Sequence, residues 1–385
     1  MNLDYIYDPI TKQKYNLNTL EGKKVLKKLI NFVKQNHTVN DAEEQNLRDL
    51  IFIANDNETI ELPNELSFGQ ILVKVEYSGI CGSQIGEIEG VKGPDNYLPH
   101  LLGHEGCATV LETGPGVSNI KKDDLVVLHW MEGRGIQSQP PIYKWEGKNL
   151  TAGWVTTFNS HAVVSENRCT VIPANTNKEL AALFGCAITT GFGVIENNVN
   201  LQFGQSLVVF GSGGIGLNII QAASLRNAFP IIAVDIFDNR LELASDMGAD
   251  FLINAKKVNA KEEILKILNN RELDVFIDNT GNPKIIELGY EVTKPTGKVA
   301  LVGVPMKDQN INIFSLPLHF GKTIFGSHGG ESNPNEDIAR YLNLIQAKNL
   351  QIDKLITGRF KLEEINKAIE FIKSGQSAGR IMIYT

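Results

Sequence analysis

Three side chains that bind zinc well occur in separate, glycine-bearing stretches of the sequence. Cys81 lies in "GICGSQ", His104 precedes Glu105 in "GHEG", and Cys186 lies in "GCAITTGFG". Two thiolates and an imidazole suit Zn²⁺, and a fourth position left to water or substrate distinguishes a catalytic zinc from a structural one. Each residue alone also has a structural explanation. A single cysteine near a strand end is often a small buried apolar side chain, and a histidine can hydrogen-bond within a turn.

A glycine-rich turn lies further along, in "VVFGSGGIGLNIIQAA", where it follows an apolar strand and opens a helical stretch. In this context Gly211 permits a tight turn, Gly213 lets the backbone approach a pyrophosphate, and Gly216 allows the helix to pack closely on the strand. The helix N-terminus favours the negative charge of the pyrophosphate. We therefore predict a dinucleotide site at the turn formed by Gly211, Ser212, Gly213, Gly214, Ile215 and Gly216. The alternative is a tight strand-to-helix turn without a ligand.

An acidic residue supports the dinucleotide interpretation. Asp235 ends the next apolar stretch, "PIIAVDI", nineteen residues after Gly216. A carboxylate at this place accepts hydrogen bonds from both hydroxyls of the adenine ribose and repels a phosphate on the 2′-oxygen. The sequence therefore predicts NAD rather than NADP.

The elements that must position these residues fall into two groups. Residues from about 46 to 187 have alternating, β-like stretches such as "ILVKVEYSGI" and many glycines. From about 188, apolar strands such as "SLVVFG", "DVFIDNTG" and "GKVALVGV" alternate with helical stretches, which indicates a parallel sheet covered on both faces. Two further helical stretches, near 334–347 and 362–374, precede a last strand, "GRIMIYT".

The first 45 residues differ from the rest of the chain. Residues 20–36 place apolar side chains on one helical face and lysines on the other. We interpret them as a short helix docked on the main body, with a partner-binding or membrane-surface helix as the alternative.

Taken together, the motifs resemble the zinc-dependent alcohol dehydrogenases of the medium-chain dehydrogenase/reductase superfamily. "GICGSQ", "GHEG", "GCAITTGFG", "GSGGIG" and "LVGVP" occur in the order and spacing of that family, over residues 46–385. The resemblance implies an α/β protein with a GroES-like β domain (46–187 and 330–385), a Rossmann domain with a doubly wound parallel sheet (188–329) and an N-terminal extension (1–45).

The resemblance also implies a role for each matching residue. Cys81, His104 and Cys186 would bind the catalytic zinc, and Glu105 would be a nearby carboxylate that can transiently replace a ligand. Ser83 would take the proton of the substrate alcohol while hydride passes to NAD. The residues implied to lie along the cofactor, from nicotinamide to adenosine ribose and pyrophosphate, are Thr190, Arg240 and Arg380.

Three departures from the family pattern affect these expectations. The stretch 129–164 has none of the clustered cysteines that hold a second, structural zinc in many relatives, so we expect one zinc per chain. The usual "CGSD" is "CGSQ", and we expect Gln84 to accept the hydrogen bond of His104 without supplying a charge. Gly86 occupies the place where several relatives have a histidine that ends the proton relay, so protons must leave by another route.

The aromatic residues of the same stretch bear on the substrate. Trp130 aligns with a pocket-lining position in relatives, and an aromatic wall would suit an apolar or aryl alcohol. Tyr143, Trp145 and Trp154 either extend that wall or pack the loop. The alternative functions are a zinc-free, NADPH-dependent enone or quinone reductase and a non-catalytic nucleotide-binding protein. The three retained candidate ligands and Asp235 argue against the reductase, and the same ligands together with Ser83 argue against the non-catalytic protein.

Composition limits the remaining possibilities. The chain has 385 residues and a net charge of −7 without a basic stripe, which argues against nucleic acid as a partner. The start, "MNLDYIYDPI", lacks the pattern of a signal peptide, and the sequence has no apolar run long enough to span a membrane. The four cysteines form no CxxC pair, so reduced thiols or metal ligands are expected. We expect a cytoplasmic homodimer or homotetramer acting on a small alcohol or aldehyde.

Overall fold

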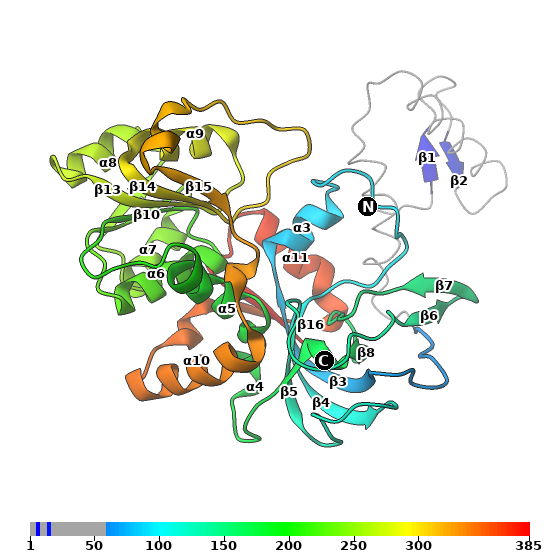
Figure 1. The fold of residues 1–385 in the computed structure, drawn as a ribbon. Helices are drawn as coiled ribbons and strands as arrows, with labels where there is room; N and C mark the ends of the chain where they lie inside the picture. Colours follow the sequence, from blue (N-terminus) through cyan, green and yellow to red (C-terminus); the bar gives the residue numbers. More distant parts are fainter. Residues whose placement is uncertain (1–4, 8–13, 17–58) are drawn as a thin grey trace.

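The computed structural model describes residues 59–385 and, near the N-terminus, two short strands that pair antiparallel, β1 (Tyr5–Tyr7) and β2 (Lys14–Asn16). The helix predicted over residues 20–36 lies outside the described residues. Residues 59–385 form two bodies placed side by side, one built on a parallel sheet and the other on a mostly antiparallel sheet (Figure 1).

The parallel sheet has six strands in the spatial order β12-β11-β10-β13-β14-β15. Numbered along the chain this order is 3-2-1-4-5-6, which is the doubly wound arrangement whose strand order reverses between β10 and β13. Ligands of such sheets bind outside the carboxyl ends of the strands at that point. The strands are β10 (Leu207–Phe210), β11 (Ile231–Asp235), β12 (Phe251–Asn254), β13 (Leu273–Asp278), β14 (Thr293–Leu301) and β15 (Thr323–Gly326).

Helices cover both faces of this sheet, as the continuous apolar runs of its central strands require. Along β10, Leu207 and Val209 pack into one apolar cluster with α6 and α7, whereas Val208 and Phe210 pack into another with α8 and α9. The helices are α6 (Gly214–Leu225), α7 (Asp238–Asp246), α8 (Ala260–Leu268) and α9 (Pro283–Val292). Side chains of Asn259 and Asn282 cap the N-termini of α8 and α9.

The second sheet has the strand order β16-β17-β3-β4-β5-β9, with β8 paired to β3. Its last strand in sequence, β17, pairs antiparallel with β3, so the C-terminal end of the chain returns to the antiparallel-sheet body. The strands are β3 (Gln70–Ile80), β4 (Glu105–Thr113), β5 (Leu125–His129), β8 (His161–Ser165), β9 (Cys169–Val171), β16 (Ile356–Lys361) and β17 (Arg380–Tyr384). A separate hairpin joins β6 (Ile142–Trp145) to β7 (Lys148–Thr151).

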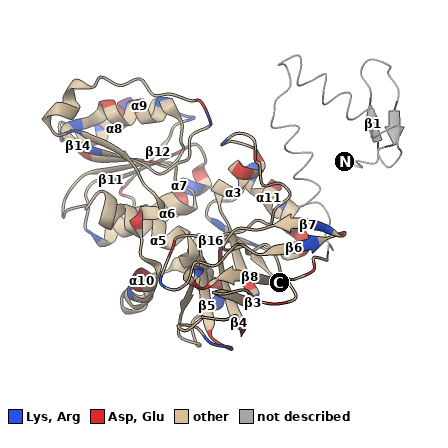
Figure 2. Cartoon of the chain, turned by 45° about the vertical axis from the view of Figure 1, so that its right-hand side comes forward, with Lys and Arg blue, Asp and Glu red and all other residues tan. Residues whose placement is uncertain are grey.

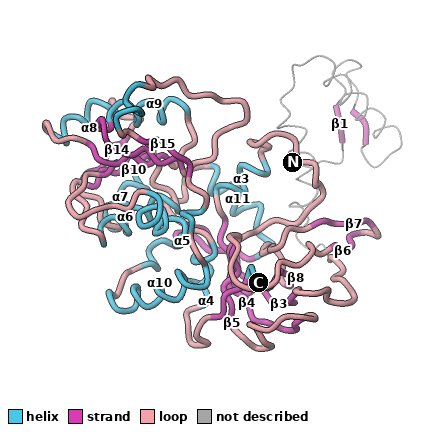
Figure 3. Tube along the Cα trace, in the orientation of Figure 1, coloured by secondary structure: helices cyan, strands magenta, loops and turns pink. Residues whose placement is uncertain are grey.

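Four of the remaining helices lie beside or between the sheets (Figures 1 and 3). They are α4 (Lys178–Ala182), α5 (Ala187–Gly193), α10 (Pro334–Lys348) and α11 (Ile365–Lys373). The predicted helical stretches near 334–347 and 362–374 correspond to α10 and α11. The short helix α3 (Gly82–Ile88) lies in the region for which we expected mainly strands. The predicted fold class is confirmed, whereas the predicted domain boundaries stay predictions.

Lysine, arginine, aspartate and glutamate occur among the described residues of both bodies (Figure 2). Among the described residues no single helix meets the length and apolarity of a bilayer span, although one bent pair, residues 178–185 with 187–198, passes on length and composition alone.

Candidate active site

The three candidate zinc ligands come together from three different connections. Cys81 directly follows β3 and is the N-cap of α3, His104 immediately precedes β4, and Cys186 immediately precedes α5. One ligand atom from each lies within 4.8 Å of the other two. Both cysteines are buried, with 6% and 5% of their surface exposed. The fold therefore gathers residues that are 105 positions apart into one small cluster.

The chemistry of this cluster fits zinc. His104 Nε2 is buried without a hydrogen-bond partner, and a buried polar atom left in that state costs free energy unless a ligand satisfies it. Two sulfurs and one ring nitrogen are donors that Zn²⁺ takes with a fourth position open. The neighbouring thiol of Cys186, together with Arg380 and His104, holds the pKa of Cys81 well below its ordinary value despite burial. This favours the thiolate form that zinc requires.

Glu105 lies next to the cluster and is fully buried. Its Oε1 lies 2.8 Å from Arg380 Nε, and its Oε2 accepts a hydrogen bond from the Ala187 N–H at 3.1 Å. Two glycines make room for this residue. A Cβ on Gly79 would lie 2.2 Å from Glu105 Oε1, and one on Gly185 would lie 2.7 Å from Glu105 Cα. Gly79 of "GICGSQ" and Gly185 of "GCAITTGFG" are therefore required because Glu105 approaches their backbones too closely for a side chain to fit.

Arg380, the first residue of β17, connects the metal cluster to the glycine-rich turn. Its guanidinium faces Glu105 on one side, and a Cβ on Gly214 would lie 3.1 Å from its Nη1. Burial lowers the pKa of Arg380, but the negative groups of Cys81, Glu105 and Cys186 outweigh it and raise the pKa above its ordinary value. A permanent positive charge therefore lies between the candidate zinc ligands and the start of α6.

Three further predicted residues lie around the cluster. Ser83 is in the first turn of α3 and partly buried. Thr190 is on α5, with its Oγ1 4.0 Å from Cys186 Sγ. The hydrogen bond that we expected from His104 to Gln84 does not form in the described part of the structure. Gln84 Oε1 instead accepts from the Cys81 N–H at 3.2 Å, because glutamine at the third helical position has the length to cap the helix start.

The glycine-rich turn has the geometry expected of a pyrophosphate site. Gly211 has a φ of +96°, which side-chain-bearing residues rarely adopt, and a Cβ on Gly216 would lie 2.1 Å from the Gly211 carbonyl oxygen. A Cβ on Gly213 would meet nothing within 4 Å, so this side of the turn is open to a ligand. Ser212 is buried, and Gly214 and Ile215 begin α6.

Asp235 lies at the carboxyl end of β11, beside this turn. Its Oδ2 accepts from the Ser212 N–H at 2.7 Å, and its Oδ1 accepts from the Ile236 N–H at 2.7 Å. Arg240 Nη1 lies 3.8 Å from Asp235 Oδ2, and Arg240 Nε donates to the Ser377 carbonyl oxygen at 3.2 Å. The acid is therefore held in place at the edge where an adenosine ribose would lie.

The aromatic residues separate into two groups. Trp130 directly follows His129, which ends β5 and pairs with Glu105. The ring of His328, which follows β15 in the other body, packs edge-on against Trp130 with centroids 4.9 Å apart. Sequence reasoning did not identify His328, because nothing local in "GSHGG" indicates this long-range contact. Tyr143 is fully buried and accepts from the Val163 N–H at 2.7 Å, so it packs the loop.

Fold and site together define a two-domain, zinc-dependent oxidoreductase that uses a dinucleotide. Residues 67–174 match the family of the alcohol dehydrogenase GroES-like domain, and residues 214–347 match the zinc-binding dehydrogenases. The chain therefore belongs to the zinc-type alcohol dehydrogenases of the medium-chain dehydrogenase/reductase superfamily, as the sequence resemblance predicted.

Individual relatives agree with this assignment. An S-(hydroxymethyl)glutathione dehydrogenase of Paracoccus denitrificans is 26% identical, covering 82% of this chain and 93% of the relative. The crystal structure of benzyl alcohol dehydrogenase from Acinetobacter calcoaceticus superposes with a TM-score of 0.75 at 26% identity, covering 84% of this chain and 94% of that one. An alcohol dehydrogenase zinc-binding domain protein from Burkholderia ambifaria gives a TM-score of 0.76 at 27% identity, covering 85% and 94%.

Proposed function

We propose that this enzyme transfers a hydride between a small apolar or aryl alcohol and NAD, with one zinc bound by Cys81, His104 and Cys186. The observation that carries the proposal is the buried cluster of two thiols and an imidazole nitrogen that has no other partner. Arg380 connects this cluster to the open side of a glycine-rich turn, so that metal and dinucleotide would meet in one site.

The residues of the chain have separate tasks in this proposal. Zinc, when bound, polarises the substrate oxygen, and NAD accepts or supplies the hydride. The Ser83 hydroxyl takes the proton of the alcohol. Thr190 contacts the reacting end of the dinucleotide, and Arg380 neutralises its pyrophosphate while holding Glu105 in position.

The cofactor form is proposed to be NAD. Asp235 presents a carboxylate where the 2′-phosphate of NADP would have to lie, and four nearby groups hold that carboxylate in place. Arg240 partly offsets the charge, so discrimination is expected to be moderate.

An aryl or apolar alcohol is supported by the Trp130–His328 pair. The two rings come from different bodies and meet edge-on, and Trp130 directly follows His129, the β5 partner of Glu105, so the pair would form an aromatic wall near the site. One relative is named for benzyl alcohol and another for S-(hydroxymethyl)glutathione. We propose that this chain acts on alcohols of the first type.

The experiment is a metal analysis of the purified protein combined with the absorbance of NADH as NAD⁺ and a panel of alcohols are added. About one zinc per chain and NADH formation with benzyl alcohol are the expected results. No zinc after purification without chelator would favour the zinc-free reductase, and zinc without turnover on any alcohol would favour a non-catalytic nucleotide-binding protein.

We also propose a cytoplasmic homodimer or homotetramer. All four cysteines are free and buried, which suits a reducing compartment. Within the described residues β15 is an edge strand, and the segment before it exposes large apolar side chains, including Phe314 at 71% and Phe320 at 69%. A free sheet edge beside exposed apolar residues supports association with a second copy.

A further inference from the structure

Helix α3 presents two different faces. Its buried residues are Gln84, Ile85 and Ile88, which pack toward the antiparallel body. The other face carries Ser83, Gly86 and Glu87, all of them partly exposed. Residues three and four positions apart are neighbours on a helix surface, so Gly86 and Glu87 are the two positions that lie one turn from Ser83.

Gly86 places no side chain on this face, although the backbone there does not require a glycine. The helix is regular there, and a Cβ on Gly86 would meet Val91 Cγ2 at 3.5 Å, an ordinary van der Waals contact. A side chain could therefore stand at this position. Because Gly86 offers no titratable group, the next group that can accept a proton on the Ser83 face is the Glu87 carboxylate.

Glu87 belongs to a second cluster of titratable groups, separate from the zinc ligands. His100 Nε2 lies 3.7 Å from Glu87 Oε1 and 2.7 Å from Asp95 Oδ2. His100 Nδ1 lies 3.0 Å from the Leu101 carbonyl oxygen, to which it donates, so Nε2 is the nitrogen that gains and loses the proton. The side chain of His100 is 13% exposed and that of Glu87 is 42% exposed. The cluster thus extends from a protected imidazole to solvent.

Helix α3, which carries Glu87, lies near the junction of the two bodies, whereas His100 lies beside Thr151 at the end of β7. The loop that follows α3 contacts the other body, since the Lys307 N–H donates to the Val91 carbonyl oxygen at 2.8 Å, and Figure 1 shows α3 on the side that faces the parallel-sheet body. The charged groups that face His100 are Asp95 and Glu87. Burial lowers the pKa of His100, but the Leu101 carbonyl and these two carboxylates raise it above its ordinary value.

We propose that Glu87 and His100, supported by Asp95, form the outer proton route of the active site and replace the group that Gly86 does not supply. This inference rests on the proposed function. As the alcohol is oxidised, its O–H bond breaks and its proton goes to Ser83 Oγ, while hydride passes to NAD⁺. The proton already on Ser83 moves one helical turn along α3, through water, to the Glu87 carboxylate. Glu87 passes it to His100 Nε2 or to bulk water, and every proton lost by the substrate is thereby accounted for.

The direction of the pH dependence follows. His100 can accept a proton only when its Nε2 is deprotonated. Because the pKa of His100 is raised, the rate of proton release during alcohol oxidation should fall as the pH drops through this pKa, which lies above that of an ordinary histidine. His100→Asn removes the titrating nitrogen but keeps a donor for the Leu101 carbonyl, and this variant should lose that limb of the pH profile.

The test follows proton release with a pH dye, and NADH by absorbance, in single turnovers of zinc-loaded enzyme with NAD⁺ and benzyl alcohol. We expect Glu87→Gln and His100→Asn to slow proton release about tenfold, toward the low end of general acid–base effects, and added imidazole to restore it. Zinc content and the Kd for NAD⁺ should not change. Gly86→His, introduced into the Glu87→Gln protein, should restore proton release without imidazole.

A second readout needs no turnover. Histidine ring signals followed by NMR against pH should show that the pKa of His100 falls in Glu87→Gln and in Asp95→Asn. Glu242→Gln, at an exposed position on α7, is the matched control and should match the wild-type protein in both measurements.

The possible failures are distinguishable. If the wild-type protein turns over but both variants release protons at the wild-type rate with no response to imidazole, the proton route is wrong and the proposed function stands. An unchanged pKa of His100 in Glu87→Gln would likewise contradict the coupling. If the wild-type protein binds no zinc and reduces no NAD⁺ with any alcohol, both proposals fail together.

Discussion

The four cysteines have the same side chain but different chemistry, because their surroundings differ. Burial raises the pKa of Cys107 to about 12 and raises that of Cys169 further, so both thiols stay neutral. Cys81 and Cys186 lie with His104 and the positive Arg380. The contact between the two thiols lowers the pKa of Cys81 and raises that of Cys186, so before a metal binds the thiolate of this pair is on Cys81.

Cys186→Ser is expected to lose zinc and alcohol oxidation together, because a hydroxyl is a much poorer zinc ligand than a thiolate. Cys107→Ser and Cys169→Ser should keep one zinc per chain and lose only about 1–3 kcal/mol of stability from burying a hydroxyl. Zinc per chain after dialysis against chelator-free buffer, together with thermal unfolding, measures both effects. Retention of zinc by Cys186→Ser would show that the ligand set is wrong.

Asp235→Asn should narrow the preference for NAD⁺ over NADP⁺. The amide oxygen can still accept from the Ile236 and Phe237 N–H groups, but the amide NH₂ cannot accept from the Ser212 N–H, and the side chain carries no charge against a 2′-phosphate. We expect the wild-type ratio of kcat/KM values to favour NAD⁺ by at least about tenfold, equivalent to about 1.4 kcal/mol, and the variant to lose most of it. Asp246→Asn, exposed at the end of α7, is the control. Equal use of both cofactors by the wild-type protein would refute the assignment.

Residue types and local spacing were enough to propose members of the site but not to predict their contacts. Cys81, His104 and Cys186 could be proposed as ligands because few residue types bind zinc. The partner of Gln84 was predicted wrongly, since the competing donor, the Cys81 N–H, becomes available only once α3 forms. His100 and His328 could not be found from sequence, because their partners are brought close only by the fold.

At the scale of elements, the parallel sheet was the most predictable part of the chain. Its strands are continuous apolar runs bounded by turns, so β10, β11 and β13 can be read from local sequence. Helix α3 could not, because it has only seven residues, two of them glycines, and too few turns to show a helical period.

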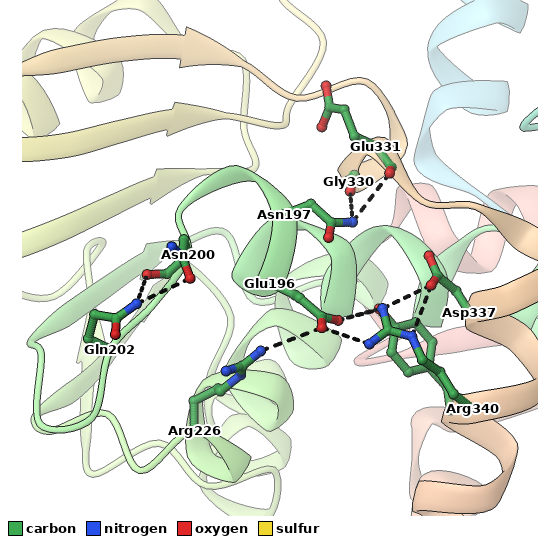
Figure 4. A network of polar contacts seen from close by, with 10 residues as sticks. Glu196, Asn197, Asn200, Gln202, Arg226, Gly330, Glu331, Asp337 and Arg340 are labelled. Carbon is green, nitrogen blue, oxygen red and sulfur yellow. Dashed lines mark hydrogen bonds and ion pairs between the residues drawn. The ribbon is translucent and has the colours of Figure 1, made fainter.

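A polar network joins three elements where the bodies meet (Figure 4). Glu196, on the π-helical turn after α5, accepts from Arg340 of α10 at 2.7 Å and from the Tyr341 hydroxyl at 3.1 Å, and it faces Arg226 at the end of α6. The hydrogen bond from Arg340 lowers the pKa of Glu196, although burial opposes it. Helices from both sides of the junction are thus connected through one carboxylate.

Glu196→Gln should lower the free energy of unfolding at neutral pH by about 1 kcal/mol, a value reduced for the partial exposure of these side chains. A carboxylate whose pKa is lowered by folding adds stability above its unfolded pKa and loses it as the pH falls through the folded value. The difference between wild type and variant should therefore shrink below about pH 4. Urea unfolding across pH measures it. Glu263→Gln, which removes a surface pair with Lys266, should change stability by only a few tenths of a kcal/mol. Equal effects of the two variants would contradict this role for the network.

At the scale of the whole molecule, the guanidinium of Arg380 contacts both bodies at the proposed site. Arg380 belongs to β17, the last strand of the antiparallel sheet, yet its guanidinium lies against the first turn of α6 in the other body. Its neighbours include Glu105 and the carbonyl of Ile80, both from the zinc side. The returning C-terminal strand therefore places one cation where metal and dinucleotide would meet.

The outer edge of the parallel sheet leads to the last prediction. In the described part of the chain β15 pairs only with β14, and nearby Phe314, Leu316 and Phe320 are 71%, 51% and 69% exposed. A two-fold axis beside such an edge lets two copies pair their β15 strands antiparallel and bury these side chains in one self-complementary contact.

The molar mass of the purified protein, measured by light scattering, should therefore correspond to at least two chains. Phe320→Asp should lower the molar mass toward that of a monomer, because the contact would bury a charge from each copy. Phe203→Asp, at a 77% exposed position before β10, is the control and should leave the molar mass unchanged. A monomeric wild-type protein, or equal dissociation by both variants, would exclude this surface as the interface.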